Sequence, residues 1–282
     1  MYPDWLPMLV FYGVLHGVVI AGVAAALALR QPSRLEVGWF FTLHRVALTK
    51  RNGPAIIDYL ARTRRWRVYG VIGSSTVAGS VAFVAPKAQL DTYAVLFAGW
   101  FFGGILAEVP VGPRHVGGVR MASLQRRTLS MYLSPGVARW IVCWAVGTVG
   151  LLVLYGATVS PPVMRRVAGV LAVLAVLTSL SVSSMRVIVR RPQPVAPPDV
   201  VAADDAIRRA AVRRIAAGWG VLQSMATIVV ARWLTAGSGS DFTAEIGMAA
   251  EVVGVLGVAA SWLVVPTRMS PPAARFGRLV VS

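Results

Sequence analysis

The chain has 282 residues, of which 56% are hydrophobic and only 14% are charged, with a mean hydropathy of +0.67 and a formal net charge of +17. Soluble globular domains average roughly 45–50% apolar and about 25% charged residues, so this composition argues against a cytosolic enzyme, a disordered tail or a secreted mini-protein. The single Cys143 excludes an internal disulfide and a thiolate metal cluster within one chain. The composition therefore predicts an integral membrane protein.

Seven apolar runs have about the length that crosses a hydrocarbon core of ~30 Å as a helix. The sequence thus predicts an all-α, polytopic transmembrane helical bundle that forms one domain. The second and third runs are the shortest, and a six-span alternative demotes one of them. The predicted spans are residues 6–29, 68–84, 93–109, 140–160, 167–188, 216–234 and 246–265.

The distribution of Arg and Lys predicts the orientation of these spans. The loops 30–67, 112–139 and 189–215, with the tail 266–282 and Arg186 at a span end, contain 24 of the 28 basic residues. Because basic residues concentrate in cytoplasmic loops, the amino terminus is expected outside and the carboxyl terminus inside. The same distribution explains the positive charge without a nucleic-acid partner. The expected location is the cell membrane, with multiple passes.

The first run is expected to be a permanent span. No basic residue precedes it, whereas Arg30 and Arg34 follow it, which is the reverse of the charge pattern of a cleavable signal peptide. In the next segment, Leu35, Trp39 and Leu43 recur every four residues, with Arg45 away from this stripe. This pattern predicts a helix that lies in the headgroup plane or one that covers the cytoplasmic base of the bundle; both alternatives remain open.

The loop 189–215 has two predicted parts. Residues 190–198 contain four prolines and are expected to form an extended spacer, whereas residues 203–215 read as a helix. Asp204 and Asp205 near the start of this helix precede Arg208 and Arg209 by four residues, which favours two intrahelical ion pairs. The helix either docks on a cytoplasmic partner or is solvated and self-paired. The candidate contacts to a partner or to anionic lipid are Trp39, Arg45, Arg64, Arg65, Arg208 and Arg209.

Three short segments resemble a set of uncharacterised polytopic membrane proteins of actinobacteria. They are residues 120–124 (Arg-Met-Ala-Ser-Leu), the pairs Tyr132–Leu133 and Arg139–Trp140, and residues 203–208 (Ala-Asp-Asp-Ala-Ile-Arg). The resemblance covers about a tenth of the chain. It implies a multi-span bacterial membrane protein and carries no activity.

Ionisable groups within lipid cost at least ~2.5–3.5 kcal/mol, so each one needs a physical reason. Glu108, at the cytoplasmic end of its span, is expected to be structural and to reach water or the arginines of the next loop. Arg232 and Glu251 lie near the outer ends of the last two spans, and we expect them to form an ion pair. His16 lies deep in the first span, where it either donates a hydrogen bond to a neighbouring helix or acts in proton relay or cofactor ligation.

The sequence contains no catalytic or cofactor-binding constellation that we recognise. Its three histidines, His16, His44 and His115, are scattered, and neither lysine follows the glycine that a phosphate-binding loop requires. We therefore expect no catalytic residue, no metal and no cofactor.

Three functions compete on this basis. The first is a non-catalytic membrane component of a multi-subunit, transport-related assembly, with membrane lipids and a protein subunit or a second copy of the chain as partners. The second is a self-sufficient permease for a small or amphipathic solute. The third, an enzyme that acts on lipid headgroups through Arg114, His115 and Arg120, lacks a nucleophile and a set of metal ligands.

Overall fold

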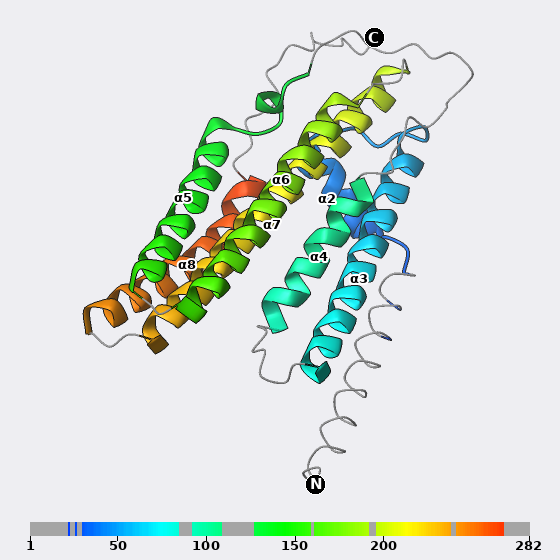
Figure 1. The fold of residues 1–282 in the computed structure, drawn as a ribbon. Helices are drawn as coiled ribbons and strands as arrows, with labels where there is room; N and C mark the ends of the chain where they lie inside the picture. The colour runs from blue at the N-terminus through cyan, green and yellow to red at the C-terminus, as the bar shows by residue number, and fades with distance from the viewer. Residues whose placement is uncertain are drawn as a thin grey trace. The chain divides into compact units, whose positions relative to one another are not determined.

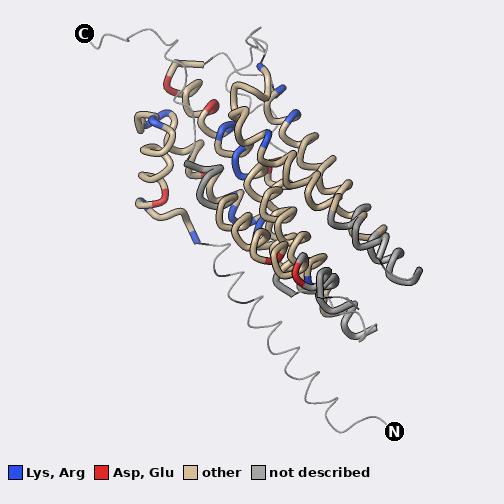
Figure 2. The backbone as a smooth tube through the Cα atoms, turned by 90° about the vertical axis from the view of Figure 1, so that its left-hand side faces the viewer, with Lys and Arg blue, Asp and Glu red and all other residues tan. Residues whose placement is uncertain are grey.

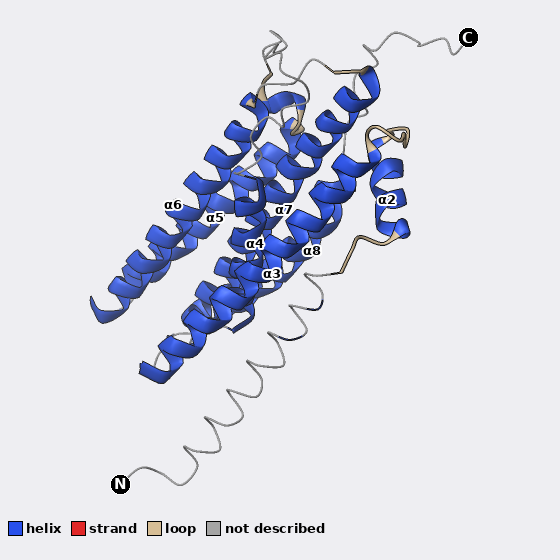
Figure 3. Ribbon diagram, turned by 90° about the vertical axis from the view of Figure 1, so that its right-hand side faces the viewer, coloured by secondary structure: helices blue, strands red, loops and turns tan. Residues whose placement is uncertain are grey.

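The computed structural model describes residues 22, 26, 30–84, 92–108, 127–158, 161–191, 196–237 and 241–267. Within these ranges every regular element is helical and no strand occurs, as Figures 1 and 3 show. The all-α expectation is thus confirmed. The chain divides into two compact units, which are described separately: Met1–Arg126 with Ser181–Ala211, and Arg127–Leu180 with Val212–Ser282.

The first unit contains α2 (Arg34–His44), α3 (Gly53–Val84) and α4 (Thr92–Glu108), with the last part of α6 (Pro161–Arg190) and the first part of α7 (Pro198–Gly237). One face of α2 packs against α3 and α7. The side chains in this core are Val37, Phe40, Phe41, Ile56, Tyr59, Ala203, Ala206 and Ala210. The alanines allow the aromatic residues of α2 to approach the backbone of α7.

Helices α3 and α4 are antiparallel and touch through glycines. A Cβ atom on Gly70 would overlap the Gly99 carbonyl oxygen, and one on Gly103 would overlap the Trp66 carbonyl oxygen. Residue numbers rise along α3 as they fall along α4. Such close backbone contact is how helices associate where no hydrophobic force drives them together.

The second unit contains the short 3₁₀ helix η1 (Leu129–Met131), α5 (Pro135–Thr158), the first part of α6, the second part of α7 and α8 (Asp241–Thr267). Helices α7 and α8 are antiparallel and meet at four successive levels. A Cβ atom on Gly220 would contact Ser261, one on Gly257 would contact Ser224, and one on Gly254 would contact Ile228. The fourth level is the contact between Arg232 and Glu251. Small residues thus set the spacing of this helix pair.

One predicted loop is helical where the sequence analysis expected no helix, and the helix expected at residues 203–215 begins earlier, at Pro198. Helix α3 begins at Gly53, within the predicted loop 30–67, and α7 begins at Pro198 and continues as one helix through the predicted span. Arginine is a good helix former, and ion pairs between Asp58 and Arg62 and between Asp204 and Arg208 join successive turns. A helix therefore need not end where its sequence becomes charged. Figure 2 marks the Lys and Arg positions along these helices.

Two described segments are long and apolar enough to cross a membrane: Ala168–Arg190 and Pro198–Arg232. The second is 67% buried within the protein, as the core helix of a soluble protein would also be, whereas the first is only 24% buried. Ala94–Glu108 and Gly247–Ser261 are shorter apolar segments. These lengths support an association with a membrane.

Candidate functional site

A buried cluster of ions joins α6, α7 and α4 in the first unit. The guanidinium of Arg208 is only 1% exposed and binds the carboxylate of Asp204, one helical turn earlier, at 2.8 Å. It also donates hydrogen bonds to the carbonyl oxygens of Ile188 and Arg191 at the end of α6. Carbonyl oxygens at the end of a helix have no backbone N–H partner within that helix, and Arg208 supplies the missing hydrogen bonds here.

Arg191 and Glu108 extend this cluster to α4 and α3. Arg191 donates a hydrogen bond to the backbone carbonyl of Glu108 at 2.6 Å, and the Tyr59 hydroxyl donates one to the Glu108 carboxylate at 2.9 Å. Burial lowers the pKa of the Arg191 guanidinium, while the charge of Glu108 acts in the opposite direction. The two arginines and the two acidic residues are thus held together, so the cluster can lock four helical segments.

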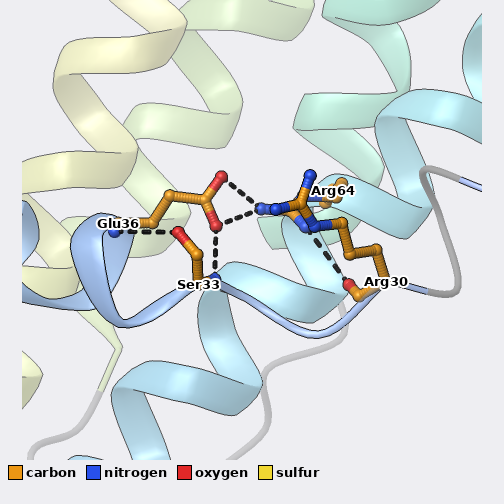
Figure 4. A network of polar contacts seen from close by, with 4 residues as sticks. All are labelled: Arg30, Ser33, Glu36 and Arg64. Atoms are coloured by element: carbon orange, nitrogen blue, oxygen red, sulfur yellow. Dashed lines mark hydrogen bonds and ion pairs between the residues drawn. The ribbon is translucent and has the colours of Figure 1, made fainter.

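A second network fixes α2 on α3 (Figure 4). Ser33 and Glu36 form a capping box, in which the Ser33 Oγ accepts from the Glu36 backbone N–H and the Glu36 carboxylate accepts from the Ser33 N–H at 2.8 Å. Arg64 of α3 binds both carboxylate oxygens of Glu36 at 2.6 Å and also donates to the Arg30 carbonyl oxygen. The Ser33 hydrogen bond and Arg64 hold the pKa of Glu36 below its ordinary value.

The segment after α2 is fastened to the start of α7. Arg45 ends α2 in the left-handed conformation, with φ 51°. The Thr49 hydroxyl then donates a hydrogen bond to the Asp199 carboxylate at 2.7 Å, which lowers the pKa of Asp199. Asn52, which is fully buried, donates to the Ala47 carbonyl oxygen. Both ends of α2 are therefore fixed, and the helix cannot roll about its axis without breaking these contacts.

Uncharged polar side chains line the inner face of the second unit. Trp219 and Gln223 of α7 both donate to the Thr178 hydroxyl of α6, at 3.1 and 3.3 Å. Thr227, one turn further along α7, shares a hydrogen bond of 2.8 Å with Thr148 of α5. Gln223, Thr227 and Thr148 are at most 2% exposed. Hydrogen-bonding groups spaced every four residues on α7 thus connect three helices.

The exterior of the same unit is apolar. Val142, Val146, Val149 and Val153 of α5 are 44–65% exposed and recur on one side of the helix. Helix α8 exposes Met248, Val252, Val253, Val255 and Leu256 in the same way, each by more than half. The buried residues of this unit include apolar side chains such as Ile141, Val212 and Leu222 beside the polar ones, so it is the apolar exterior that sets the unit apart from a soluble helical protein.

The expected contact between Arg232 and Glu251 is present. The Arg232 Nε donates to the Glu251 carboxylate at 3.0 Å, and the two side chains are 61% and 35% exposed. The i,i+4 pairs of Asp204 with Arg208 and of Asp205 with Arg209 are also present. His16 and the residues Arg114, His115 and Arg120 lie outside the described residues.

One of the sequence interpretations is wrong. Arg208, a candidate contact to a partner or lipid, is buried and bound within its own unit, so it cannot touch either. Glu108 is only 3% exposed; its carboxylate accepts from Tyr59, and its backbone carbonyl accepts from Arg191. Of the two alternatives, water or an arginine, the structure shows an arginine, which comes from the loop 189–215 rather than from the next loop. By contrast, Trp39, Arg45 and Arg65 are exposed, Arg209 is half-buried beside Asp205, and Arg64 is occupied by Glu36.

Sequence reasoning missed Tyr59, Arg191 and the polar face of α7. The sequence around Tyr59 does not indicate that the Tyr59 hydroxyl binds the carboxylate of Glu108. The face of α7, however, has a readable pattern, because Trp219, Gln223 and Thr227 recur every four residues inside a predicted span. Polar side chains at that spacing mark the interior of a membrane bundle.

The described residues contain no group of three or more His, Cys, Asp or Glu that could hold a metal ion. Cys143 is an exposed free thiol.

Comparisons with protein-family models, curated proteins and solved structures found no match to the chain.

Proposed function

We propose that this protein is a multi-pass component of the cell membrane, with about seven spans, its amino terminus outside and its carboxyl terminus in the cytoplasm. The observation that carries the proposal is the apolar exterior of the second unit, where valines of α5 and α8 are exposed, together with the buried and hydrogen-bonded Gln223 and Thr227. In water, such continuous apolar faces would favour aggregation. In lipid, exposed apolar faces carry no penalty in free energy, whereas polar groups must find hydrogen-bond partners inside the protein.

Its proposed role is that of the non-catalytic membrane subunit of a transport-related assembly. Support comes from the rigid structure on the predicted cytoplasmic side, where α2 and the start of α7 share a core with α3. A segment that only connected two spans would not need this core or the buried Arg208 cluster. A fixed platform of this kind suits a protein that holds a partner in one orientation.

Co-purification tests this role. The full-length protein is extracted from native membranes in a mild detergent, and the chains in the purified particle are identified. We expect a second subunit, or a second copy of this chain, in a constant ratio. A particle that always contains one copy alone would contradict the proposal.

The polar face of α7 favours a second candidate, a permease for a small uncharged or amphipathic solute. Trp219, Gln223 and Thr178 could exchange their mutual hydrogen bonds for bonds to a solute with hydroxyl or amide groups. Transport would then be lost in Gln223→Leu but retained in Ser224→Ala, whose hydroxyl bonds only its own helix at Gly220. Uptake by reconstituted vesicles that is equal for both variants and the unaltered protein would exclude this route.

A further inference from the structure

Helix α2 has two apolar faces, and only one of them is covered within the described protein. Val37, Phe40 and Phe41 are buried against α3 and α7. On the opposite side, Leu35, Trp39 and Leu43 are 72%, 65% and 51% exposed, with the small residues Gly38 and Thr42 beside them. Because the packed face and both ends of α2 are fixed, the exposed face cannot turn inward.

We propose that this outward face of α2, defined by Leu35, Trp39 and Leu43, inserts into the headgroup region of a membrane containing anionic lipid. The inference rests on the proposed membrane placement of residues 6–29 and adds a specific lipid contact to it. Its occupant is lipid rather than a protein partner for two reasons, the position of α2 along the chain and the charge around it.

The position of α2 follows from Arg64. A single guanidinium binds the Arg30 carbonyl oxygen and the Glu36 carboxylate (Figure 4). Arg30 directly follows the predicted first span, so this contact holds the first turn of α2 at the end of that span. Only residues 31–33 separate the two, which permits at most about 14 Å between Arg30 and Arg34 even in an extended chain. Leu35 and Trp39, in the first part of α2, are therefore expected to lie at the depth of the lipid headgroups.

The charge around α2 is complementary to anionic lipid. Arg34, Arg45 and Lys50 are exposed, whereas Glu36, the one acidic residue between Arg30 and Arg51, is occupied by Arg64. A tryptophan and leucines beside exposed cations form the pattern of a helix that lies in the membrane interface. Anionic headgroups attract such cations, and the indole ring prefers the same depth.

The test measures the depth of α2 in the full-length protein. Cys143 is replaced by Ser, and an environment-sensitive fluorophore is attached at Leu35→Cys in nanodiscs of phosphatidylcholine with or without phosphatidylglycerol. We expect blue-shifted emission and strong quenching by lipids that carry a spin label near the headgroup, both increased by phosphatidylglycerol. The matched control is Ile57→Cys on α3, also apolar and exposed in the same unit, which should keep its aqueous emission.

A further variant isolates the role of charge. Combining Arg34→Gln with Arg45→Asn removes two cations, and asparagine tolerates the left-handed conformation of residue 45. The increase caused by phosphatidylglycerol should then largely disappear. An increase of the same size as in the unaltered background would overturn the anionic-lipid part of the proposal.

The remaining outcomes separate this inference from the proposed function. A label at Val146→Cys on the exposed side of α5 reports whether the bundle is in lipid. If lipids quench Val146→Cys but not Leu35→Cys, the contact of α2 with lipid is refuted while the membrane placement stands. If Leu35→Cys is shielded from aqueous iodide without lipid quenching, protein covers α2, which also refutes the contact. If lipids quench neither label, both proposals fail.

Discussion

At the scale of single residues, burial separates two ion pairs that look identical in the sequence. Asp204–Arg208 and Asp205–Arg209 have the same spacing and were predicted with equal weight. In the structure the Arg208 side chain is 1% exposed and that of Arg209 is 16% exposed. The two ion pairs could be predicted from the sequence, but their burial could not. Residue 208 faces α6 only once the long helices are packed together.

This difference gives a matched pair of variants. Asp204→Ala leaves the buried Arg208 without its carboxylate and should destabilise the protein by about 3 kcal/mol. Asp205→Ala removes a more exposed pair and should cost about 0.5 kcal/mol. Thermal unfolding of both variants in the same detergent measures the difference. Equal shifts in Tm would show that Arg208 is not buried as described.

The carboxylates that hold α2 predict a dependence on pH. Glu36 and Asp199 both have lowered pKa values in the folded protein, below the ordinary values of 4.5 and 3.8. Their contribution to stability is complete above those ordinary values and is lost as the pH falls through the lowered ones. Hydrogen exchange of the α2 amides should therefore accelerate in acid, after correction for the intrinsic rate. Glu36→Gln should show faster exchange already at neutral pH, and protection that matches the unaltered protein would contradict the role of Glu36.

At the scale of elements, the sequence predicted which segments are helices better than it predicted their faces and ends. Leu35, Trp39 and Leu43 are the obvious apolar stripe of α2, yet Val37, Phe40 and Phe41 form the packed side. When a helix has two apolar faces, the periodicity of its sequence does not show which face packs against the rest of the protein. Likewise, the charged start of α3 was expected to be a loop, although arginine and an ion pair one turn apart support a helix there. The polar interior of the second unit was missed because its residues carry no charge.

The contact between α3 and α4 predicts opposite effects for two nearby glycines. A Cβ at Gly70 would meet the backbone of Gly99, whereas a Cβ at Gly73 would meet nothing within 4 Å. Gly70→Ala should therefore separate the helices and reduce the yield of folded protein severely. Gly73→Ala should be neutral or stabilise the helix by up to about 1 kcal/mol. Similar yields of the two variants in size-exclusion chromatography would refute the close contact.

The contact between Arg232 of α7 and Glu251 of α8 predicts the result of exchanging their charges. Arg232→Glu alone places two carboxylates together, and Glu251→Arg alone places two guanidinium groups together. The double swap restores opposite charges, so its folded yield should exceed that of either single variant. A double variant that does no better than the singles would show that the 3.0 Å contact does not contribute.

At the scale of the whole molecule, composition and charge predicted an all-helical protein associated with a membrane, and the described residues agree. Two described helices are long and apolar enough to cross a membrane. The apolar exterior of the second unit adds a physical reason, since valines face outward while the hydrogen-bonded Gln223 is buried. Orientation still depends on the distribution of arginines.

The most direct test of the proposed topology is to label both ends of the chain in intact cells. In a Cys143→Ser background, a membrane-impermeant maleimide should react with Tyr2→Cys in whole cells and with Val280→Cys only after the cells are lysed. That result places the two ends on opposite sides, as an odd number of spans requires. Labelling of both cysteines, or of neither, before lysis would place the ends on the same side and contradict the account.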